Sequence, residues 1–168
     1  NFGEVRRAEL GGRAVVVKTL RADDAHVQAE LLKEIQVMTG IPAHAHIVDF
    51  IGFCLRPLAV VSEYMQHGDL HAWVQANSFS PVLGVRFALH AALGMQHLHK
   101  SNVLHNDLAA RNLLLTEGDT VKIGDFGLSR AAENYYAVSQ QTFPIRWSAP
   151  EVIQRRRFSQ QSDVWSFC

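Results

Sequence analysis

The chain of 168 residues is 48% hydrophobic and 19% charged, which is typical of a globular sequence that can bury a sizeable core. Sixteen Lys and Arg residues balance sixteen Asp and Glu residues, so the net charge gives no overall attraction to nucleic acid or to an anionic membrane. No apolar run approaches the roughly 18–20 residues of a membrane span. Cys54 and Cys168 lie far apart without metal-ligand spacing, which favours a reduced compartment without a structural disulfide.

The first part of the chain has the pattern of strands around one helix. Residues 13–19 form a β-branched run after the glycine pair 11–12, which predicts a strand preceded by a hairpin. From Asp23 the spacing becomes helical, with a stop at residues 40–42, and residues 46–64 then predict two further strands. The apolar stripe of the expected helix is Val27, Leu31, Ile35 and Met38.

The second part of the chain opens with a long helix and is less rich in strands. One face of this helix is traced by Leu83, Phe87, Ala91, Met95 and Leu98. We therefore predict an α+β fold with two lobes. The small, strand-rich lobe with one helix occupies residues 1–65, and the first part of the larger, mainly helical lobe occupies residues 66–168.

Two short segments carry residues suited to moving a phosphoryl group. Residues 105–112 read HNDLAARN, and residues 125–127 read DFG. In this spacing, Asp107 can accept the proton of a hydroxyl, Asn112 can bind a metal ion through its amide oxygen, and Asp125 supplies a carboxylate to the same ion. An isolated DFG would mean little, so the order of the two segments carries the signal.

Five elements occur in an order that chance rarely produces. They are VVVK ending at Lys18, the helical Glu34, residues 105–112, Asp125, and APE at residues 149–151. With these elements the chain resembles the protein kinase family over essentially its whole length. The segments DLAARN (107–112) and FPIRW (143–147) resemble the forms found in tyrosine kinases. The resemblance implies a two-lobed protein-kinase-like fold, with ATP as phosphoryl donor and Mg²⁺, or alternatively Mn²⁺, as metal.

The resemblance also implies a role for each catalytic residue. Lys18 would hold the α and β phosphates, and Glu34 would orient its ammonium group through an ion pair. Asp107 would be the catalytic base, and Arg111 would neutralise charge beside the acceptor hydroxyl. Asn112 and Asp125 would bind the metal, since Mg²⁺ prefers oxygen ligands.

The adenine site is implied by matching positions in the first part of the chain. Val5, Val16 and Leu114 would form its apolar walls, and backbone groups around Glu63 and Met65 would bind the adenine edge. Val16 departs from the family, which usually has alanine there, and the larger side chain is expected to crowd the ring. Ser62 occupies the gatekeeper position and is small. The residues expected to contact ATP are Gly3, Val5, Val16, Lys18, Ser62, Glu63, Met65, Gly68 and Leu114.

Residues 128–147 match the activation segment, and Tyr135 and Tyr136 lie where tyrosine kinases carry autophosphorylation sites. Asn106 replaces the arginine that usually follows the histidine, and a neutral amide cannot bind a phosphate in the bidentate manner of arginine. We therefore predict that loop phosphorylation activates weakly or through another partner such as Arg130.

The segment containing Pro144, Arg146 and Trp147 resembles the shelf that supports an acceptor tyrosine. Together with Arg111, this shelf implies protein substrates with tyrosine acceptors and a role in phosphotyrosine signalling. The implied location is the cytoplasm or the cytoplasmic side of a membrane receptor, and the sequence carries cues for both.

Two other function classes stay open at this point. A nucleotide-binding pseudokinase that acts as a scaffold or allosteric module is suggested by Asn106, Val16 and the incomplete phosphate loop at residues 1–5. A serine/threonine or dual-specificity kinase is disfavoured by the AAR and FPIRW segments. Nine histidines also raise a zinc hypothesis, especially the pairs 44/46 and 97/99, but neither pair lies in an HExxH helix or near spaced cysteines.

The two ends of the sequence match interior positions of a kinase. Residues 1–5 resemble the second half of a Gly-rich phosphate loop, and residues 163–168 resemble the start of a long central helix. In the family, the glutamate at position 151 pairs with an arginine located beyond residue 168. We therefore expect a fragment that is truncated at both ends and, with Glu151 as a buried carboxylate lacking its partner, poorly folded and inactive on its own.

Overall fold

The computed structural model describes residues 4–19, 25–126, 129–131 and 144–168, and it describes residues 25–31, 34, 130 and 131 by their backbone alone. Its first region is an antiparallel sheet in the order β1-β2-β4-β3. The strands are β1 (Val5–Leu10), β2 (Arg13–Thr19), β3 (Phe50–Leu55) and β4 (Leu58–Glu63). Gly11 and Gly12 have φ angles of 58° and 80°, which suit the tight turn between β1 and β2. The predicted hairpin is confirmed.

Helix α1 (Ala25–Gly40) connects β2 to β3 and ends at the predicted glycine. Ile35 and Met38, from its predicted apolar stripe, are buried and share a core cluster with Val60 of β4. Phe126 and Leu98 belong to the same cluster, so α1 joins the sheet to the rest of the molecule through apolar packing. Asp23, where the helix was expected to begin, lies outside the described residues.

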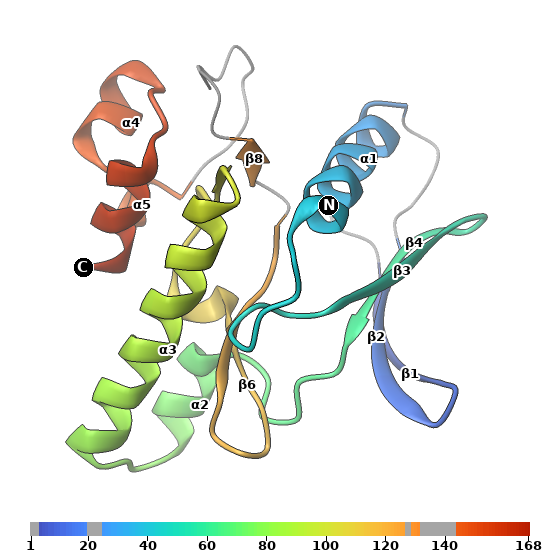
Figure 1. Cartoon of the computed structure of the whole chain (residues 1–168), viewed down its shortest axis with the longest axis horizontal. Helices are drawn as coiled ribbons and strands as arrows, with labels where there is room; N and C mark the ends of the chain where they lie inside the picture. The colour runs from blue at the N-terminus through green and yellow to red at the C-terminus, as the bar shows by residue number, and fades with distance from the viewer. Residues whose placement is uncertain (1–3, 20–24, 127–128, 132–143) are drawn as a thin grey trace.

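The second region is built around two helices, α2 (Leu70–Ala76) and α3 (Pro81–Lys100), which Figure 1 shows beside each other away from the sheet. The hydroxyl of Ser80 accepts a hydrogen bond from the Leu83 amide, and Pro81 occupies the first helical position, as expected at a helix start. The predicted stripe of α3 is confirmed as its core-facing side, since Phe87, Ala91, Met95 and Leu98 are buried.

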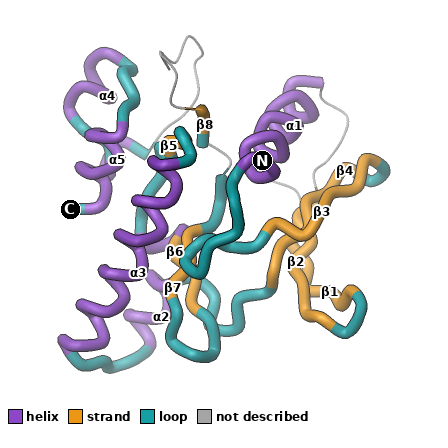
Figure 2. Tube along the Cα trace, viewed as in Figure 1, coloured by secondary structure: helices purple, strands orange, loops and turns teal. Residues whose placement is uncertain are grey.

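Short strands lie between α3 and the sheet region, as Figure 2 shows in orange. Strand β6 (Leu113–Leu115) pairs with β7 (Val121–Ile123), and β5 (Val103–Leu104) pairs with β8 (Arg130–Ala131). A short 3-10 helix, η1 (Ala110–Asn112), leads directly into β6. The pairing of β6 with β7 brings residues 105–112 and residue 125 close together, between the two regions.

The segment between α1 and β3, residues 41–49, packs against both β7 and α3. The Val48 amide donates to the Ile123 carbonyl at 2.9 Å, and the Ile123 amide donates to the His46 carbonyl at 2.9 Å. A Cβ atom at Gly94 of α3 would lie 2.6 Å from the His46 carbonyl oxygen. Only glycine permits this approach, so the sequence of α3 is adapted to the segment that crosses it.

The last described elements are the 3-10 helix η2 (Ile145–Trp147), α4 (Pro150–Arg155) and α5 (Gln160–Phe167). Ser159 and Ser162 form a capping box at the start of α5. Glu151 lies in the first turn of α4 and is only half-buried, so the prediction that it is a buried carboxylate is wrong. None of the helices in the described part of the chain combines the length and apolarity that crossing a bilayer requires.

Candidate active site

The segment that begins at His105 is held in place by the buried imidazole of His105 itself. His105 is fully buried, its Nε2 lies 3.1 Å from the Gly124 carbonyl oxygen, and its Nδ1 accepts a hydrogen bond from the Asp107 amide at 3.3 Å. Its ring centroid lies 5.7 Å from that of Phe126. A neutral ring that donates through Nε2 and accepts through Nδ1 satisfies both contacts, so His105 connects residue 107 to the segment carrying Asp125.

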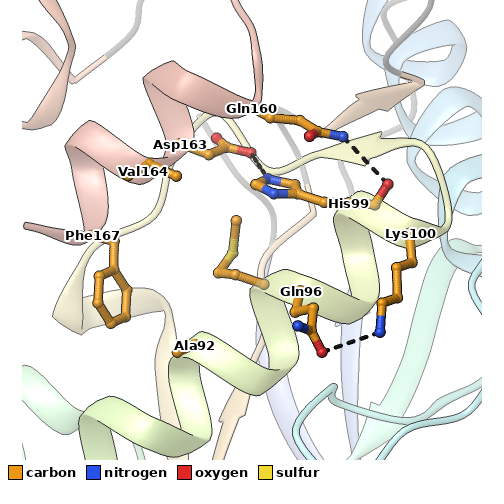
Figure 3. Close-up of a pocket in the computed structure, with 9 residues that line it drawn as sticks. Ala92, Gln96, His99, Lys100, Gln160, Asp163, Val164 and Phe167 are labelled. Carbon is orange, nitrogen blue, oxygen red and sulfur yellow. Dashed lines mark hydrogen bonds and ion pairs between the residues drawn. The ribbon is translucent and has the colours of Figure 1, made fainter.

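A second anchor comes from Asp163 of α5, whose side chain is only 1% exposed. Its carboxylate accepts hydrogen bonds from the amides of His105 and Asn106, both at 2.9 Å. His99 of α3 lies 3.0 Å away through Nε2, and Figure 3 shows this contact at the edge of a cavity of about 410 Å³ between α3 and α5. None of the predicted site residues lines this cavity, so the cavity is not part of the candidate site.

Sequence reasoning missed Asp163 as a positioning residue. The available signal was the carboxylate in an otherwise uncharged helix, two residues before a tryptophan, which is ambiguous because Asp163 also lies in the first turn of α5. An acidic residue in a first turn is ordinarily explained by the helix dipole. Its real contacts are with amides 57 and 58 positions earlier in the chain, and only the folded structure brings them together.

Asp107 is surrounded by groups that keep it in one orientation. The Asn112 amide nitrogen donates to the Asp107 carbonyl oxygen at 2.6 Å and to its carboxylate at 2.9 Å. Arg111 forms an ion pair with the other carboxylate oxygen. The pKa of Asp107 is raised above its ordinary value of 3.8, chiefly by burial and also by the negative charge of Asp125, while Asn112 and Arg111 oppose the rise. A raised pKa makes the carboxylate a better proton acceptor.

Asp125 links this loop to the sheet. It lies just beyond β7 with a left-handed backbone, φ 57°, and its carboxylate is 3.5 Å from the Lys18 ammonium of β2. The Asp125 side chain is 46% exposed, so its carboxylate is open to a ligand as well as to the lysine. Asp125 follows Gly124, whose amide donates a hydrogen bond to the Asn112 carbonyl oxygen at 2.9 Å, so the structure brings Lys18, Asp107, Asn112 and Asp125 close together.

The donor set suits a hard divalent cation. Asn112 uses both hydrogens of its amide nitrogen on Asp107, so its oxygen is the atom of this side chain that can bind a cation. Asp125 adds an exposed carboxylate, and Mg²⁺ is commonly held by one or two protein oxygens together with phosphates and water. The residues present therefore fit a magnesium ion that arrives with a phosphorylated ligand.

Two of the three predicted adenine walls, Val5 and Val16, share one face of the four-stranded sheet. In the strand register Val16 lies opposite Ser62, and Lys18 lies opposite Val5 on one side. Opposed residues and residues two apart project to the same face, so all four side chains face the same way. Leu114 lies on β6 and packs closely against Gly124. A Cβ atom added at Gly124 would lie only 3.1 Å from the Leu114 Cδ1 atom.

The connection after β4 is tied to β6. The His67 amide donates to the Leu115 carbonyl at 3.0 Å, and the Leu115 amide donates to the Gly68 carbonyl at 2.9 Å. Gly68 has φ 67°, a conformation that favours glycine, and Met65 is buried beside it. These bonds set the distance between residues 62–65 and Leu114. The adenine ring is expected to lie between them.

The Glu63 side chain has a structural environment of its own. Its carboxylate accepts from the Asp49 amide at 2.7 Å and from the Lys122 ammonium at 2.6 Å, and Arg13 lies 3.7 Å away. It therefore joins β2, β4, β7 and the segment before β3. The Glu63 side chain is thus engaged within the fold, and the contact of its backbone with a nucleotide stays a prediction.

Some predicted residues cannot be placed. Gly3, Tyr135 and Tyr136 lie outside the described residues, and so do the side chains of Glu34 and Arg130. The ion pair between Lys18 and Glu34 therefore stays a prediction. Glu34 does belong to α1, as expected.

The three predicted shelf residues lie in or just before η2. Arg146 and Trp147 are exposed, and Pro144 is half-buried. The Trp147 carbonyl oxygen accepts a hydrogen bond from the Ser166 hydroxyl at 2.7 Å, which attaches η2 to α5. The same helix therefore holds both the loop of Asp107 and the segment expected to support an acceptor.

The structure combines an antiparallel sheet and its packed helix with a second, helical region. A lysine, two aspartates and an asparagine lie between the two regions. This is the architecture of a protein kinase. The comparisons agree with this class. The chain belongs to the protein tyrosine and serine/threonine kinase family, which matches residues 1–168. The predicted α+β, kinase-like fold is thereby confirmed.

Several curated relatives are similar over most of this chain. The tyrosine-protein kinase transforming protein Abl of Abelson murine leukemia virus is 40% identical over 160 residues, which cover 91% of this chain and 21% of that protein. The BDNF/NT-3 growth factors receptor of Gallus gallus is 39% identical, covering 90% and 21%. Fer-related kinase 1 of Caenorhabditis elegans is 36% identical, covering 99% and 44%. The chain thus spans between about a fifth and under a half of the length of these relatives.

Proposed function

We propose that this chain is the catalytic part of an ATP-dependent protein tyrosine kinase, which transfers the γ-phosphoryl group of Mg-ATP to a tyrosine hydroxyl of a protein substrate. The observation that carries the proposal is the cluster of Asp107, Asn112, Asp125 and Lys18, with an Asn112–Asp107 distance of 2.9 Å and a Lys18–Asp125 distance of 3.5 Å. Phosphoryl transfer requires positioning and charge stabilisation more than covalent chemistry, and this cluster supplies both.

Each charged residue has a separate task in this proposal. Lys18 binds the α and β phosphates, and its 3.5 Å contact with Asp125, a proposed metal ligand, supports this role. Asn112 and Asp125 hold Mg²⁺, with Mn²⁺ as the alternative ion; a bound divalent ion neutralises charge on the phosphates. Glu34 of α1 orients Lys18, which would make the position of α1 a determinant of activity.

Asp107 takes the proton of the tyrosine hydroxyl as the hydroxyl oxygen bonds to the γ-phosphorus, and ADP leaves with the electron pair of the broken P–O bond. Its raised pKa favours this step, because a carboxylate that binds protons more readily is a stronger general base. Arg111, through its ion pair, keeps the carboxylate aligned and offsets negative charge near the acceptor.

The nucleotide is proposed to lie between the two regions, with residues 1–65 as N-lobe and hinge and residues 66–168 as the first part of the C-lobe. Val5 and Val16 cover the adenine ring from the sheet, and Leu114 supports it from β6. Ser62 is small and therefore leaves access to a pocket behind the adenine ring, and backbone groups of Glu63 and Met65 bind the adenine edge. Gly3 and Gly68 complete the set through their backbone.

The choice of tyrosine as acceptor is supported by Arg111, by the segment of Pro144, Arg146 and Trp147, and by relatives whose names include tyrosine-protein kinases. Tyr135 and Tyr136 are the proposed autophosphorylation sites. The proposed role is in phosphotyrosine signalling, in the cytoplasm or on the cytoplasmic side of a membrane receptor. The named relatives include both a transforming kinase and a growth factors receptor.

The proposal is tested by measuring phosphotyrosine formation by the protein as it occurs in the cell. Mg-ATP is supplied as the phosphoryl donor and a tyrosine-containing polymer as the acceptor. Asp107→Asn keeps the shape of the side chain and removes the base, and we expect activity to fall about 10²–10⁴-fold. Asp119→Asn is the matched control, because this partly exposed carboxylate pairs with Arg86 within the described part of the chain, and the change should leave activity unchanged. Equal activity of Asp107→Asn and the parent would reject the proposal.

A pseudokinase is the second candidate, and Asn106 is the observation that favours it. The Asn106 amide is bound to Asp163, so the loop keeps its position, but the side chain lacks the charge with which an arginine would bind a loop phosphate. Binding of Mg-ATP without phosphotyrosine formation by the parent protein would favour this candidate. Phosphoserine or phosphothreonine as the main product would instead favour a serine/threonine kinase.

A further inference from the structure

Four histidines from distant parts of the chain stack against one another where residues 41–49 cross α3. His44 stacks on His97 with ring centroids 4.4 Å apart and planes 14° apart, and His46 stacks on His90 at 4.4 Å and 20°. His44 and His46 touch edge to face at 5.6 Å. The rings thus form one continuous series, and all four are half-buried.

The spacing on α3 explains how the series forms. His90, Gly94 and His97 lie four and three residues apart, so they share one face of the helix. The missing side chain at Gly94 lets the His46 carbonyl approach the helix between the two histidines. His99, which the sequence paired with His97, instead contacts Asp163 on another side of α3.

In two of the rings, Nδ1 accepts a hydrogen bond from a backbone amide and therefore carries no proton. His44 Nδ1 accepts the His46 amide at 3.2 Å, and His90 Nδ1 accepts the Val121 amide at 3.2 Å. A nitrogen that accepts an amide hydrogen cannot carry a proton of its own, so protonation of either ring breaks its bond. The other two rings face carbonyl oxygens, His46 Nδ1 at 3.0 Å from Val121 and His97 Nε2 at 2.8 Å from Pro42.

Stacked rings direct their nitrogens sideways rather than toward a common point, so this arrangement does not suit a metal ion. Among the described residues, no group of three or more His, Cys, Asp or Glu side chains has metal-binding geometry. What the arrangement does favour is neutral imidazoles, because parallel rings at 4.4 Å would repel each other once both are charged.

We propose that these four histidines, His44, His46, His90 and His97, form a pH-sensitive joint that holds residues 41–49 on α3 and β7 near neutral pH and releases them as the pH falls. The joint matters because residues 41–49 begin where α1 ends and bond to Ile123, two residues before Asp125. Release would loosen both α1 and the segment leading to Asp125.

The charged groups around the joint do not offset its protonation. The positive charge of Arg86 bears on His90, and Arg86 itself pairs with Asp119 at 3.4 Å. The carboxylates nearest in sequence are already engaged, and none of the described ones forms an ion pair with the four rings. The other neighbouring charged residues pair as Asp49 with Arg13 at 3.0 Å, Glu63 with Lys122 at 2.6 Å, and Asp163 with His99 at 3.0 Å, while Lys100 donates to Gln96 at 3.2 Å.

The direction of the pH effect follows from the shifts of two rings. Burial lowers the pKa of His44 below 6.5, with the charges of His97 and His46 adding to the effect. Burial also lowers the pKa of His90, with His46 and Arg86 adding. A folded-state pKa below the unfolded value gives stability that is fully present above 6.5 and is lost as the pH falls below it, because the open state then binds more protons.

Hydrogen exchange of the protein as it occurs in the cell, compared at pH 7.5 and 5.5 after correction for the intrinsic pH dependence of exchange, tests the proposal. One pH unit below 6.5, each histidine that must stay neutral when closed raises the opening constant by up to about tenfold, or about a hundredfold for two. We expect this increase in residues 41–49 and 121–123, and not in α2. Equal pH dependence in α2 would overturn the proposal.

The variant His44→Asn/His90→Asn removes the two rings whose Nδ1 accepts an amide hydrogen, and the Asn oxygen can still accept those hydrogens. We expect it to keep residues 41–49 protected at pH 5.5. His71→Asn is the control, since His71 is exposed on α2, and it should show the parent's pH dependence. A double variant with the parent's pH dependence would overturn the proposal. If the double variant fails to fold, the parent protein alone tests the proposal. The test is then whether its pH-dependent increase in exchange occurs in residues 41–49 and 121–123 and not in α2. Exchange does not require catalysis, so this result is independent of the proposed kinase activity.

Discussion

Two attachments to α3 hold the parts of the candidate site, and they differ in chemistry. Asp163 holds the loop of Asp107 through a carboxylate that is 1% exposed and bonds two backbone amides as well as His99. The histidine joint holds residues 41–49 through half-buried imidazoles, two of which accept amide hydrogens. A charged acceptor in a buried site makes strong bonds, whereas a neutral imidazole keeps its bond only while it stays unprotonated. The comparison sets a loop held by a buried carboxylate beside a segment whose attachment we propose to depend on pH.

The largest expected effect comes from breaking the first attachment with Asp163→Ala. This change leaves the amides of residues 105 and 106 buried without an acceptor, at about 1–3 kcal/mol each, so the free energy of unfolding should fall by about 2–6 kcal/mol. Denaturant unfolding measures the loss. Asp119→Asn is again the control, because a surface carboxylate should contribute less than about 0.5 kcal/mol. Similar stability of the two variants would show that the buried carboxylate is not an anchor.

A smaller effect is expected from crowding the second attachment with Gly94→Ala. The new Cβ would meet the His46 carbonyl oxygen at 2.6 Å and the Ile123 side chain at 2.8 Å, so we expect a loss of about 1–3 kcal/mol from overpacking. Thermal unfolding at pH 7.5 provides the measurement.

Gly84→Ala in the same helix is the matched control for this change. Its Cβ would meet only the partly exposed Phe79 ring at 3.2 Å, which can move, and alanine gains up to about 1 kcal/mol of helix propensity over glycine. Stability should therefore stay equal or rise. A loss in Gly84→Ala as large as in Gly94→Ala would indicate a general effect on α3 rather than a close approach of residues 41–49.

The smallest effect is expected from Tyr135→Phe/Tyr136→Phe. Asp163 binds residue 106 through its amide, so the loop keeps its position with asparagine there, and no arginine at 106 is available to bind a loop phosphate. We expect the turnover number with Mg-ATP to change less than about tenfold, below the range typical of losing a directly acting catalytic group. Asn106→Arg should increase the dependence on these tyrosines. A large loss of turnover in the double phenylalanine variant would contradict the prediction.

Periodicity and motif spacing were enough to predict much of this molecule. The β-branched run of β2, the helical stripe of α3 and the glycine end of α1 each depend on neighbours within a few residues, and all were confirmed. The grouping of Asp107, Arg111 and Asn112 is likewise local, because one turn and η1 join them. For these features, the chain carries the information in short stretches.

Other features depend on groups that lie far apart in the chain. Asp163 and the amides it binds are 57 and 58 residues apart, and His44 and His97 are 53 apart. The sequence suggested His97 with His99 as a pair, but neighbours two apart on a helix face different directions, and the structure gives them different partners. Glu151 was expected to be buried, yet its place in the first turn of α4 leaves it half-exposed.

Short-range preferences of the backbone and side chains thus decide which elements form and which catalytic residues share a loop. Packing decides the rest, because the close crossing at Gly94 and the buried carboxylate of Asp163 exist only once helices, strands and loops meet. Burial then sets the charge preferences of the groups that are brought together, as the lowered pKa of His44 and the raised pKa of Asp107 show.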